Sequence, residues 1–352
     1  MGWLERIGLR AIDRLLGVDL GTNSMKLCVL KEQKGRLVLE HLTQASYRED
    51  ILNDGYIIDP FFVGTELKRL MSQEKIKATH AASAVSSYSV ISKYISVPAV
   101  EEEEFEDAIR PEIEAAIPIP LSEMYYSFCP VGFSQEREEL VDVFVVAVKR
   151  GIVDDFRKAF ELAGLTLEIL DVDLLAMCNL VEEIYGPVDS AVMVMDIGSS
   201  VTNLAILKEG RVQFSREILF GGNALTRSIE KVMSVPYEEA EERKKAFDPE
   251  VSDLIEDFIF NIISEIRKTT NFYLSAKPNE SLGAIYLTGG SARLQGLKER
   301  ISDEIGIATE LVDPFKLLSG ELNVERYEEL RYGCTLAVYL ASRVRDLKAR
   351  GR

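Results

Sequence analysis

Two stretches of the sequence, nearly half the chain apart, combine an acidic residue with a glycine and small polar residues. The first reads VDLGTNSMKLCVLK at positions 18–31, and the second reads MDIGSSVTNLAILK at positions 195–208. They align without a gap: an aspartate precedes an aliphatic residue, a glycine and a serine or threonine, and a strand-like run ends in lysine. One such turn is typical of an ordinary hairpin, whereas two matched copies indicate that the turn has a function.

The residue types in these stretches suit the binding of a magnesium phosphate. Gly21 and Gly198 permit positive φ and a close approach to a ligand, and successive backbone N–H groups can surround phosphate oxygens. Asp19 and Asp196 would repel phosphate, so we expect them to hold Mg²⁺ through water, because this cation prefers oxygen ligands. Lys26 can neutralise phosphate charge, although two plain hairpins with self-satisfied turns remain the alternative. The accompanying hydroxyl and amide side chains are Thr22, Asn23, Ser24, Ser199, Ser200 and Thr202.

A third glycine-containing turn lies near the C-terminus. The stretch AIYLTGGSARLQGLKERI at positions 284–301 has the pattern of a strand, a turn at Gly289 and Gly290, and a helix with apolar residues at helical spacing. Backbone N–H groups at a helix start and the flat surface of a glycine pair fit the adenosine end of a nucleotide.

The surrounding pattern predicts the elements that position these turns. Each acidic hairpin is followed by a second turn and a third strand-like run, so each half of the chain begins with a β-meander. A pattern that recurs once at this distance indicates two duplicated domains, because repeat arrays have periods of about 20–50 residues.

Composition excludes several classes of function. The net charge is −17, which argues against non-specific nucleic-acid binding. Four cysteines and two histidines are scattered singly, which argues against zinc or iron–sulfur chemistry. No run approaches the ~18 apolar residues of a membrane span, and we expect a cytoplasmic protein.

The first sixteen residues, MGWLERIGLRAIDRLL, have a separate amphipathic helical pattern. Such a helix could pack on its own domain, contact a partner, or lie in a membrane interface, where Trp and Arg are favoured. The basic tail RVRDLKARGR at positions 343–352 keeps the membrane alternative open.

Helical periodicity predicts three further elements. Residues 105–117 have one apolar face, in which Pro111 predicts a kink or the start of a second short helix. An amphipathic helix is expected over Val153–Ala163, ended by Gly164. A long helix over 251–273 is expected to face inward with Leu254, Ile255, Phe258, Ile262, Ile266 and Phe272.

The three turns, in this order, resemble those of the actin-like ATPase superfamily. Three further stretches resemble its PilM family of type IV pilus assembly proteins: 95–120 and 141–180 around an inserted subdomain, and 221–247 as its GGxxLTxxI…AExxK segment. The resemblance implies an α/β actin-like ATPase fold with two duplicated ribonuclease-H-like domains and an inserted α+β subdomain of SHS2 type. The implied parts are an N-terminal amphipathic helix (1–16), a first actin-like domain (17–86, completed by 168–188 and 333–352), the inserted subdomain (87–167), a second actin-like domain (189–220, completed by 281–332) and its helical subdomain (221–280).

The resemblance also implies site residues. Glu241 and Lys244 match the Glu and Lys of AExxK, which reach the ribose or base in such folds. Asp173 lies near the water-orienting Glu or Gln of hydrolytic relatives and is the catalytic candidate; its shorter side chain predicts slow or absent hydrolysis, and a helix N-cap is the alternative. The residues on the two phosphate motifs and the adenosine motif are Asp19, Gly21, Thr22, Asn23, Ser24 and Lys26; Asp196, Gly198, Ser199, Ser200 and Thr202; and Gly289, Gly290, Ser291 and Arg293.

The function implied by the resemblance is a scaffold that binds ATP and Mg²⁺ between its two domains. Its partner would be the cytoplasmic N-terminal peptide of a PilN-like inner-membrane protein, laid in a groove. Contacts with pilus motor ATPases and the platform protein, a ring or other homo-oligomer, and a location at the inner face of the inner membrane would follow. The alternatives are a membrane-anchored division actin like FtsA, and an actin-fold ATPase or kinase, for which no catalytic base is evident.

Overall fold

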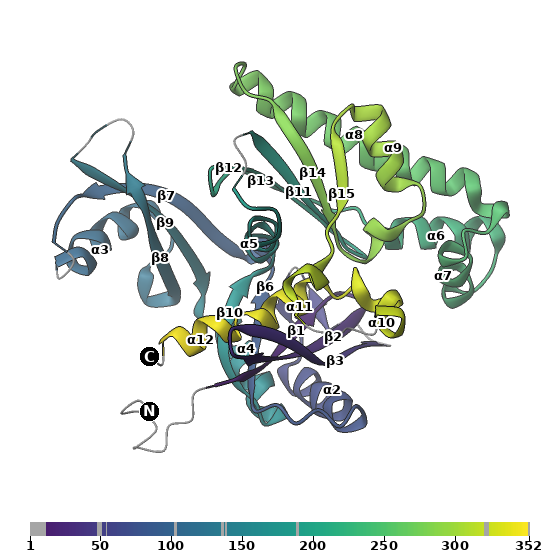
Figure 1. Cartoon of the computed structure of the whole chain (residues 1–352), viewed down its shortest axis with the longest axis horizontal. Coiled ribbons are helices and arrows are strands. Elements are labelled where there is room, and N and C mark those ends of the chain that lie inside the picture. The colour runs from purple at the N-terminus through teal and green to yellow at the C-terminus, as the bar shows by residue number, and fades with distance from the viewer. Residues whose placement is uncertain are drawn as a thin grey trace.

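Two five-stranded sheets with the same topology form the frame of the protein (Figure 1). Their strand orders are β3-β2-β1-β6-β10 and β13-β12-β11-β14-β15; in both, the first three strands are antiparallel and the remaining pairs are parallel. This repetition confirms the duplicated domains expected from the two hairpins. The computed structural model describes residues 12–47, 51–53, 55–101, 104–134, 137, 139–187, 190–319 and 324–350.

The strands of the first sheet are β1 (Arg14–Leu20), β2 (Ser24–Gln33), β3 (Arg36–Ser46), β6 (His80–Val85) and β10 (Thr166–Val172). Those of the second sheet are β11 (Ala191–Ile197), β12 (Thr202–Lys208), β13 (Arg211–Ile218), β14 (Leu282–Thr288) and β15 (Ala308–Leu311). A short hairpin joins β4 (Leu52–Asn53) to β5 (Tyr56–Ile57).

The start of β1 corrects one expectation. Residues 14–16 were expected to end an N-terminal helix, but they are strand residues that pair with residues 29–31 of β2. Leu15 and Leu16 are completely buried on opposite faces of the sheet, so their apolar pattern reflects a strand buried on both sides. Residues 1–11 of the expected helix lie outside the described part of the chain.

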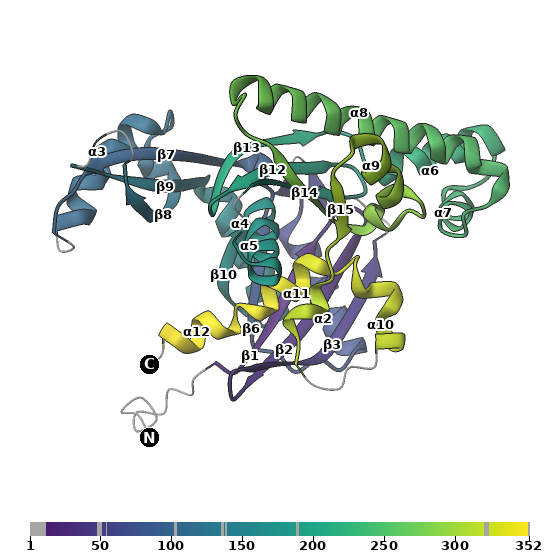
Figure 2. The ribbon, with the colours of Figure 1, turned by 45° about the horizontal axis from the view of Figure 1, so that its top comes forward.

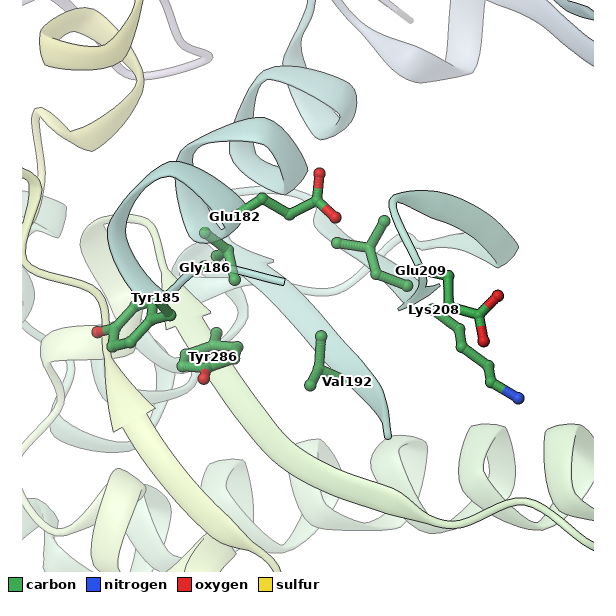
Figure 3. A pocket seen from close by; sticks show the side chains of 9 residues that line it. Glu182, Tyr185, Gly186, Val192, Lys208, Glu209 and Tyr286 are labelled. Carbon is green, nitrogen blue, oxygen red and sulfur yellow. The ribbon is translucent and has the colours of Figure 1, made fainter. Parts of the chain in front are cut away.

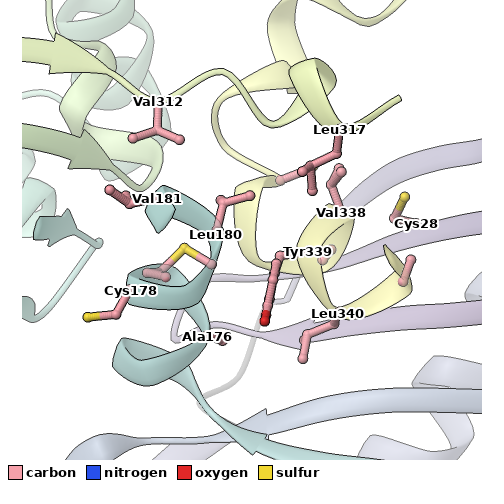
Figure 4. Packing of buried hydrophobic residues seen from close by; sticks show 14 of the residues in the cluster. Cys28, Ala176, Cys178, Leu180, Val181, Val312, Leu317, Val338, Tyr339 and Leu340 are labelled. Atoms are coloured by element: carbon pink, nitrogen blue, oxygen red, sulfur yellow. The ribbon is translucent and has the colours of Figure 1, made fainter. Parts of the chain in front are cut away.

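A central layer joins the two domains. It contains the helices α5 (Asp173–Tyr185) and α11 (Thr335–Ser342), whose apolar side chains form one cluster with the inner faces of both sheets (Figure 4). Gly17 allows β1 to approach α11 closely, because a Cβ atom there would lie 2.0 Å from the carbonyl oxygen of Ala337. The two halves therefore share a continuous interior.

The outer face of each sheet is covered by its own helices (Figures 1 and 2). α2 (Pro60–Gln73) and α4 (Arg150–Ala163) cover the first sheet, and α4 ends as predicted at Gly164, which is left-handed. The second sheet is covered by α6 (Gly222–Met233), α7 (Tyr237–Lys245), α8 (Ser252–Ala276) and α9 (Leu297–Ile305).

The long helix α8 confirms most of its predicted inward face but not Phe272. Ile255, Phe258, Ile262 and Ile266 are buried, whereas Phe272 is 62% exposed and its ring is tilted against that of Phe214, with 5.3 Å between the ring centroids. The buried stripe continues through Tyr273 instead, about 100° further around the helix.

The inserted subdomain is a three-stranded sheet in the order β7-β9-β8, with one face covered by α3. A single helix runs through Pro111, so no second helix begins there. The helix α4, placed in this subdomain by the sequence ranges, packs against α2 in the first domain. The bounds are β7 (Val90–Pro98), α3 (Phe105–Ala116), β8 (Met124–Phe133) and β9 (Leu140–Lys149).

The C-terminal segment consists of α10 (Val324–Arg331), α11 and α12 (Val344–Arg350). Basic side chains of the tail pair with acidic side chains of the same chain, so their charges are engaged within the fold. No helix among the described residues is long and apolar enough to cross a membrane. The pairs are Arg343 with Asp171, Arg345 with Glu183, and Lys348 with Glu32.

Candidate functional site

The two acidic hairpins have the same local geometry at the ends of equivalent strands. In the first, the Gly21 N–H donates to the carbonyl of Ser24 over 3.1 Å, and in the second the Gly198 N–H donates to the carbonyl of Val201 over 2.9 Å. Each bond closes a tight turn that begins directly after β1 or β11, two residues beyond the aspartate of that strand.

The acidic and basic side chains of the two hairpins influence one another across the domains. Lys26 Nζ lies 3.0 Å from Asp19 Oδ2, its cross-strand neighbour. Burial lowers the pKa of Lys26, but the attraction of Asp19 and Asp196 outweighs this and raises it overall. Burial also raises the pKa of Asp196, and the charge of Asp19 adds to this effect. Lys26 is thus paired with Asp19, and the charge of Asp196 in the other domain acts on the same lysine.

Side-chain amides bridge the domains at the same place. Asn23, from the first hairpin, and Asn223, from the first turn of α6, exchange two hydrogen bonds of 2.7 and 3.1 Å. Tyr237 accepts from Asn23 and donates to Asn223, while Asn223 also donates to Ser200 of the second hairpin. We call Asn23, Asn223 and Tyr237 the amide clasp.

The glycine pair near the C-terminus lies beside the second hairpin. Ser291 Oγ donates to the carbonyl of Gly198 over 2.9 Å, and Thr288 Oγ1 donates to Asp196 Oδ1 over 2.8 Å. Gly289 has φ +90°, and a Cβ atom there would lie 2.5 Å from the carbonyl oxygen of Ile197. Only glycine fits this contact without strain.

The AExxK pair is adjacent to these turns. Lys244 Nζ lies 2.6 Å from Glu241 Oε2 and donates to Thr226 Oγ1 over 2.8 Å. It also donates to the carbonyl of Gly222 over 3.3 Å, and the Gly222 N–H donates to the carbonyl of Gly198. The pKa of Glu241 is lowered overall: burial alone would raise it, but the neighbouring Lys244 outweighs this.

Asp173 is the first residue of α5, at the end of the preceding strand β10. Its Oδ1 accepts from the backbone N–H groups of Ser87 (2.8 Å) and Leu174 (2.6 Å), and its Oδ2 accepts from Asn203 Nδ2 (3.3 Å). Burial raises its pKa to about 7. The N-cap position belongs to Val172, whose side chain makes no capping bond, and Asp173 is the first helical residue, which accepts from the N–H of the second, Leu174.

Two of the predicted site residues make hydrogen bonds to backbone carbonyls outside the hairpins and the glycine turn. The hydroxyl of Thr202 donates to the carbonyl of Phe220, which links the start of β12 to the segment that follows β13. Arg293 donates to the carbonyl of Glu329 in α10. The remaining predicted residues Thr22, Ser24, Ser199 and Gly290 lie in the hairpins and the glycine turn described above.

Four polar residues of this site were not predicted from the sequence. Thr288 directly precedes the glycine pair, and Asn223 directly follows the Gly–Gly of the GGxxLT segment, so both positions could have been noticed. Asn203 could have been found from strand pairing, because it is the cross-strand neighbour of Asp196. Tyr237 had no local signal, since only the packing of α7 brings it to Asn23.

The residues present fit a magnesium nucleotide. The side-chain oxygen of Asn203 and the hydroxyl of Tyr47 are buried without a hydrogen-bond partner among the described residues, which leaves polar atoms for a ligand or its water. Among those residues, no three His, Cys, Asp or Glu side chains are grouped to hold a metal alone. Mg²⁺ keeps several waters and usually binds one or two carboxylates together with phosphate, and Asp19 and Asp196 are the carboxylates that would hold such an ion here.

Comparison with known proteins identifies the family. The sequence profile of the family described as "Type IV pilus assembly protein PilM" matches residues 17–342. The chain belongs to the PilM family.

Solved structures and other relatives agree with this membership. A structure titled "PilM-PilN type IV pilus biogenesis complex" superimposes with a TM-score of 0.81 at 26% identity, covering 95% of this chain and 99% of that one. The cell division protein FtsA of Streptococcus pneumoniae is 25% identical over 348 residues, or 85% of this chain and 75% of FtsA. MreB 5 of Spiroplasma citri bound to AMPPNP has a TM-score of 0.53 at 15% identity, covering 96% and 97% of the two chains, and shows the shared actin-like fold.

Two pockets of this PilM-family chain are lined by residues outside the turns of the acidic hairpins. One, at the C-terminal end of α5, is lined by Glu182, Tyr185 and Tyr286 among others and has room for about one water molecule (Figure 3).

The second pocket measures about 350 Å³ and is mostly apolar. We call it the junction pocket, because its walls come from the inserted subdomain and from both domains. Residues from these three parts are Val90 and Phe144, Leu174 and Leu175, and Val212.

Proposed function

We propose that this chain binds ATP with Mg²⁺ between its domains and uses the arrangement of the domains to present a docking site for a pilus partner. Membership of the PilM family over residues 17–342 supports the role in pilus assembly. The hydrogen bonds of Asn23 with Asn223, and of Asn223 with Ser200, join the two acidic hairpins and support a nucleotide site between them.

Each part of the cleft has a role in binding. The glycine turns at Gly21 and Gly198 offer backbone N–H groups to phosphate oxygens, and Lys26 balances their charge. Asp19 and Asp196 would orient the waters of Mg²⁺, and the ion would neutralise phosphate charge. Glu241 and Lys244 would contact the ribose or the base of the nucleotide.

Turnover is not required for this function. The carboxylate of Asp173 accepts hydrogen bonds from Ser87, Leu174 and Asn203, which leaves it little freedom to act on an attacking water. Binding alone can change the relative populations of two domain arrangements if the nucleotide prefers one of them. We expect slow hydrolysis or none.

The junction pocket is the proposed docking site. Its apolar walls at Val90, Phe144, Leu175 and Val212 suit apolar side chains of an extended or helical peptide. The related PilM–PilN complex supports a PilN-like protein as the source of this peptide, through its cytoplasmic N-terminal segment. Such a contact would hold the protein at the inner face of the inner membrane.

Peptide binding tests the docking site. A labelled N-terminal peptide of the organism's PilN protein is titrated with the full chain and with Leu175→Glu, which puts a charge into the pocket. Val232→Glu, on the exposed surface of α6, is the matched control. We expect at least a tenfold loss of affinity for Leu175→Glu alone; binding of a division-protein peptide but no PilN peptide would instead favour the FtsA-like alternative.

Nucleotide binding is tested separately with a fluorescent ATP analogue, with Mg²⁺ or with EDTA. Asp19→Asn should weaken binding in Mg²⁺ much more than in EDTA, because the carboxylate acts through the cation. Equal effects in the two buffers would contradict the assignment of Asp19. Rapid phosphate release by the unaltered protein would favour the ATPase alternative.

A further inference from the structure

The carboxylate of Asp173 is shared between the junction pocket and the cleft. Its Oδ1 accepts from the backbone of Ser87 and Leu174, and both of these residues line the pocket. Its Oδ2 accepts from Asn203, which belongs to the second domain and is the cross-strand neighbour of Asp196. One side chain thus contacts both regions.

The pocket side of this contact sits where the inserted subdomain begins. Ser87 starts a short 3-10 turn (Ser87–Ser89) between β6 of the first domain and β7 of the inserted subdomain. A ligand that moves this turn also moves an N–H group that holds Asp173 in place.

On the side of the nucleotide cleft, Asp173 is connected through the side chain of Asn203. Asn203 is buried, and its side-chain oxygen has no hydrogen-bond partner among the described residues, so it can accept from a ligand or its water. Because the same amide donates to Asp173, reorientation of Asn203 changes the hydrogen bonding of Asp173.

A second contact makes the shape of the pocket depend on the domain arrangement. The hydroxyl of Tyr94, on β7, accepts from the backbone N–H of Val212 on β13 over 3.1 Å. Nearby, Arg211 Nη1 lies 3.1 Å from Asp142 Oδ2 on β9. Since Val212 also lines the pocket, a movement of the second domain shifts one wall of the pocket relative to the inserted subdomain.

We propose that Asp173 is a positioning residue that links occupancy of the junction pocket to occupancy of the nucleotide cleft. This inference rests on the proposed function, because it takes the pocket as the peptide site and the cleft as the nucleotide site. By thermodynamic reciprocity, the factor by which nucleotide changes peptide affinity equals the factor by which peptide changes nucleotide affinity. Asp173 sets that factor without touching either ligand.

The test measures the PilN peptide's Kd with and without the non-hydrolysable analogue AMPPNP and Mg²⁺. For the unaltered protein we expect the two Kd values to differ by at least about fivefold, within the usual range of such coupling. Asp173→Asn keeps the acceptor for Ser87 and Leu174 but replaces the acceptor for Asn203 by a donor, so the ratio should fall towards one while each ligand still binds alone. Asp257→Asn, exposed on α8, is the matched control.

Asn203→Ser removes the hydrogen bond between Asn203 and Asp173 by changing its donor, and it replaces Asp173→Asn in the test if that variant does not fold. Loss of the ratio with this variant supports the link, whereas an unchanged ratio in a folded variant overturns it. A ratio of one in the unaltered protein also overturns it, although both ligands bind and the proposed function stands. Failure of the unaltered protein to bind the peptide at all refutes the docking proposal itself, and the link with it.

Discussion

The amide clasp is expected to hold the two domains together at the acidic hairpins. Asn223→Ala removes two hydrogen bonds with Asn23, one with Ser200 and one with Tyr237. Each typically contributes about 1 kcal/mol net, and because these side chains are only partly buried, water replaces some of the lost partners. We therefore expect the free energy of unfolding to fall by about 2–3 kcal/mol.

A double-mutant cycle isolates the contact between the two asparagines. Urea unfolding is measured for the unaltered protein, Asn23→Ala, Asn223→Ala and the double variant, and the two substitutions should be non-additive by about 1–2 kcal/mol. Asn271→Ala, exposed on α8, controls for the loss of an amide in general. Additive effects would refute the reasoning, because they would mean that the amides do not stabilise one another across the domains.

Two more measurements examine other parts of the site. Gly289→Ala should lower the free energy of unfolding by about 2–4 kcal/mol, because φ is positive at this position and the new Cβ atom would meet the carbonyl of Ile197. Gly290→Ala is the control, since a Cβ atom there has nothing within 4 Å. Equal melting temperatures for the two variants would contradict this prediction. Burial raises the pKa of Asp173 to about 7, so between about pH 4 and pH 7 the folded protein holds a proton that the unfolded chain has released. The stability due to this protonation is complete below about pH 4 and is lost as the pH rises through 7. Over this range the free energy of unfolding of the unaltered protein should fall by up to about 4 kcal/mol relative to that of Asp173→Asn. If the difference between the two proteins does not change with pH, the burial of this carboxyl is contradicted.

Much of the fold could be predicted because it depends on local patterns. The two hairpins at Asp19 and Asp196 identified the duplicated domains, since glycine and aspartate at a strand end have local turn preferences. The helix ending at Gly164 was likewise predictable from one residue. The start of β1 was not, because an apolar run at residues 14–16 fits a helix as well as a strand buried on both faces.

The site divides in the same way. The fourteen residues from position 18 to position 31 already contain Asp19, Gly21 and Lys26, and their chemistry follows from residue type. The position of Tyr237 against Asn23 could not be read from the chain, because more than two hundred residues separate them and only the packing of α6 and α7 closes that distance.

The sequence by itself therefore determined the two acidic hairpins, the glycine turn and membership of an actin-like family, since each depends on residues adjacent in the chain. Only the tertiary structure decided how Asp173 is used. Its neighbours Ser87 and Asn203 come from different domains, and a carboxylate acquires hydrogen-bond partners, and a raised pKa, from whatever the fold packs around it.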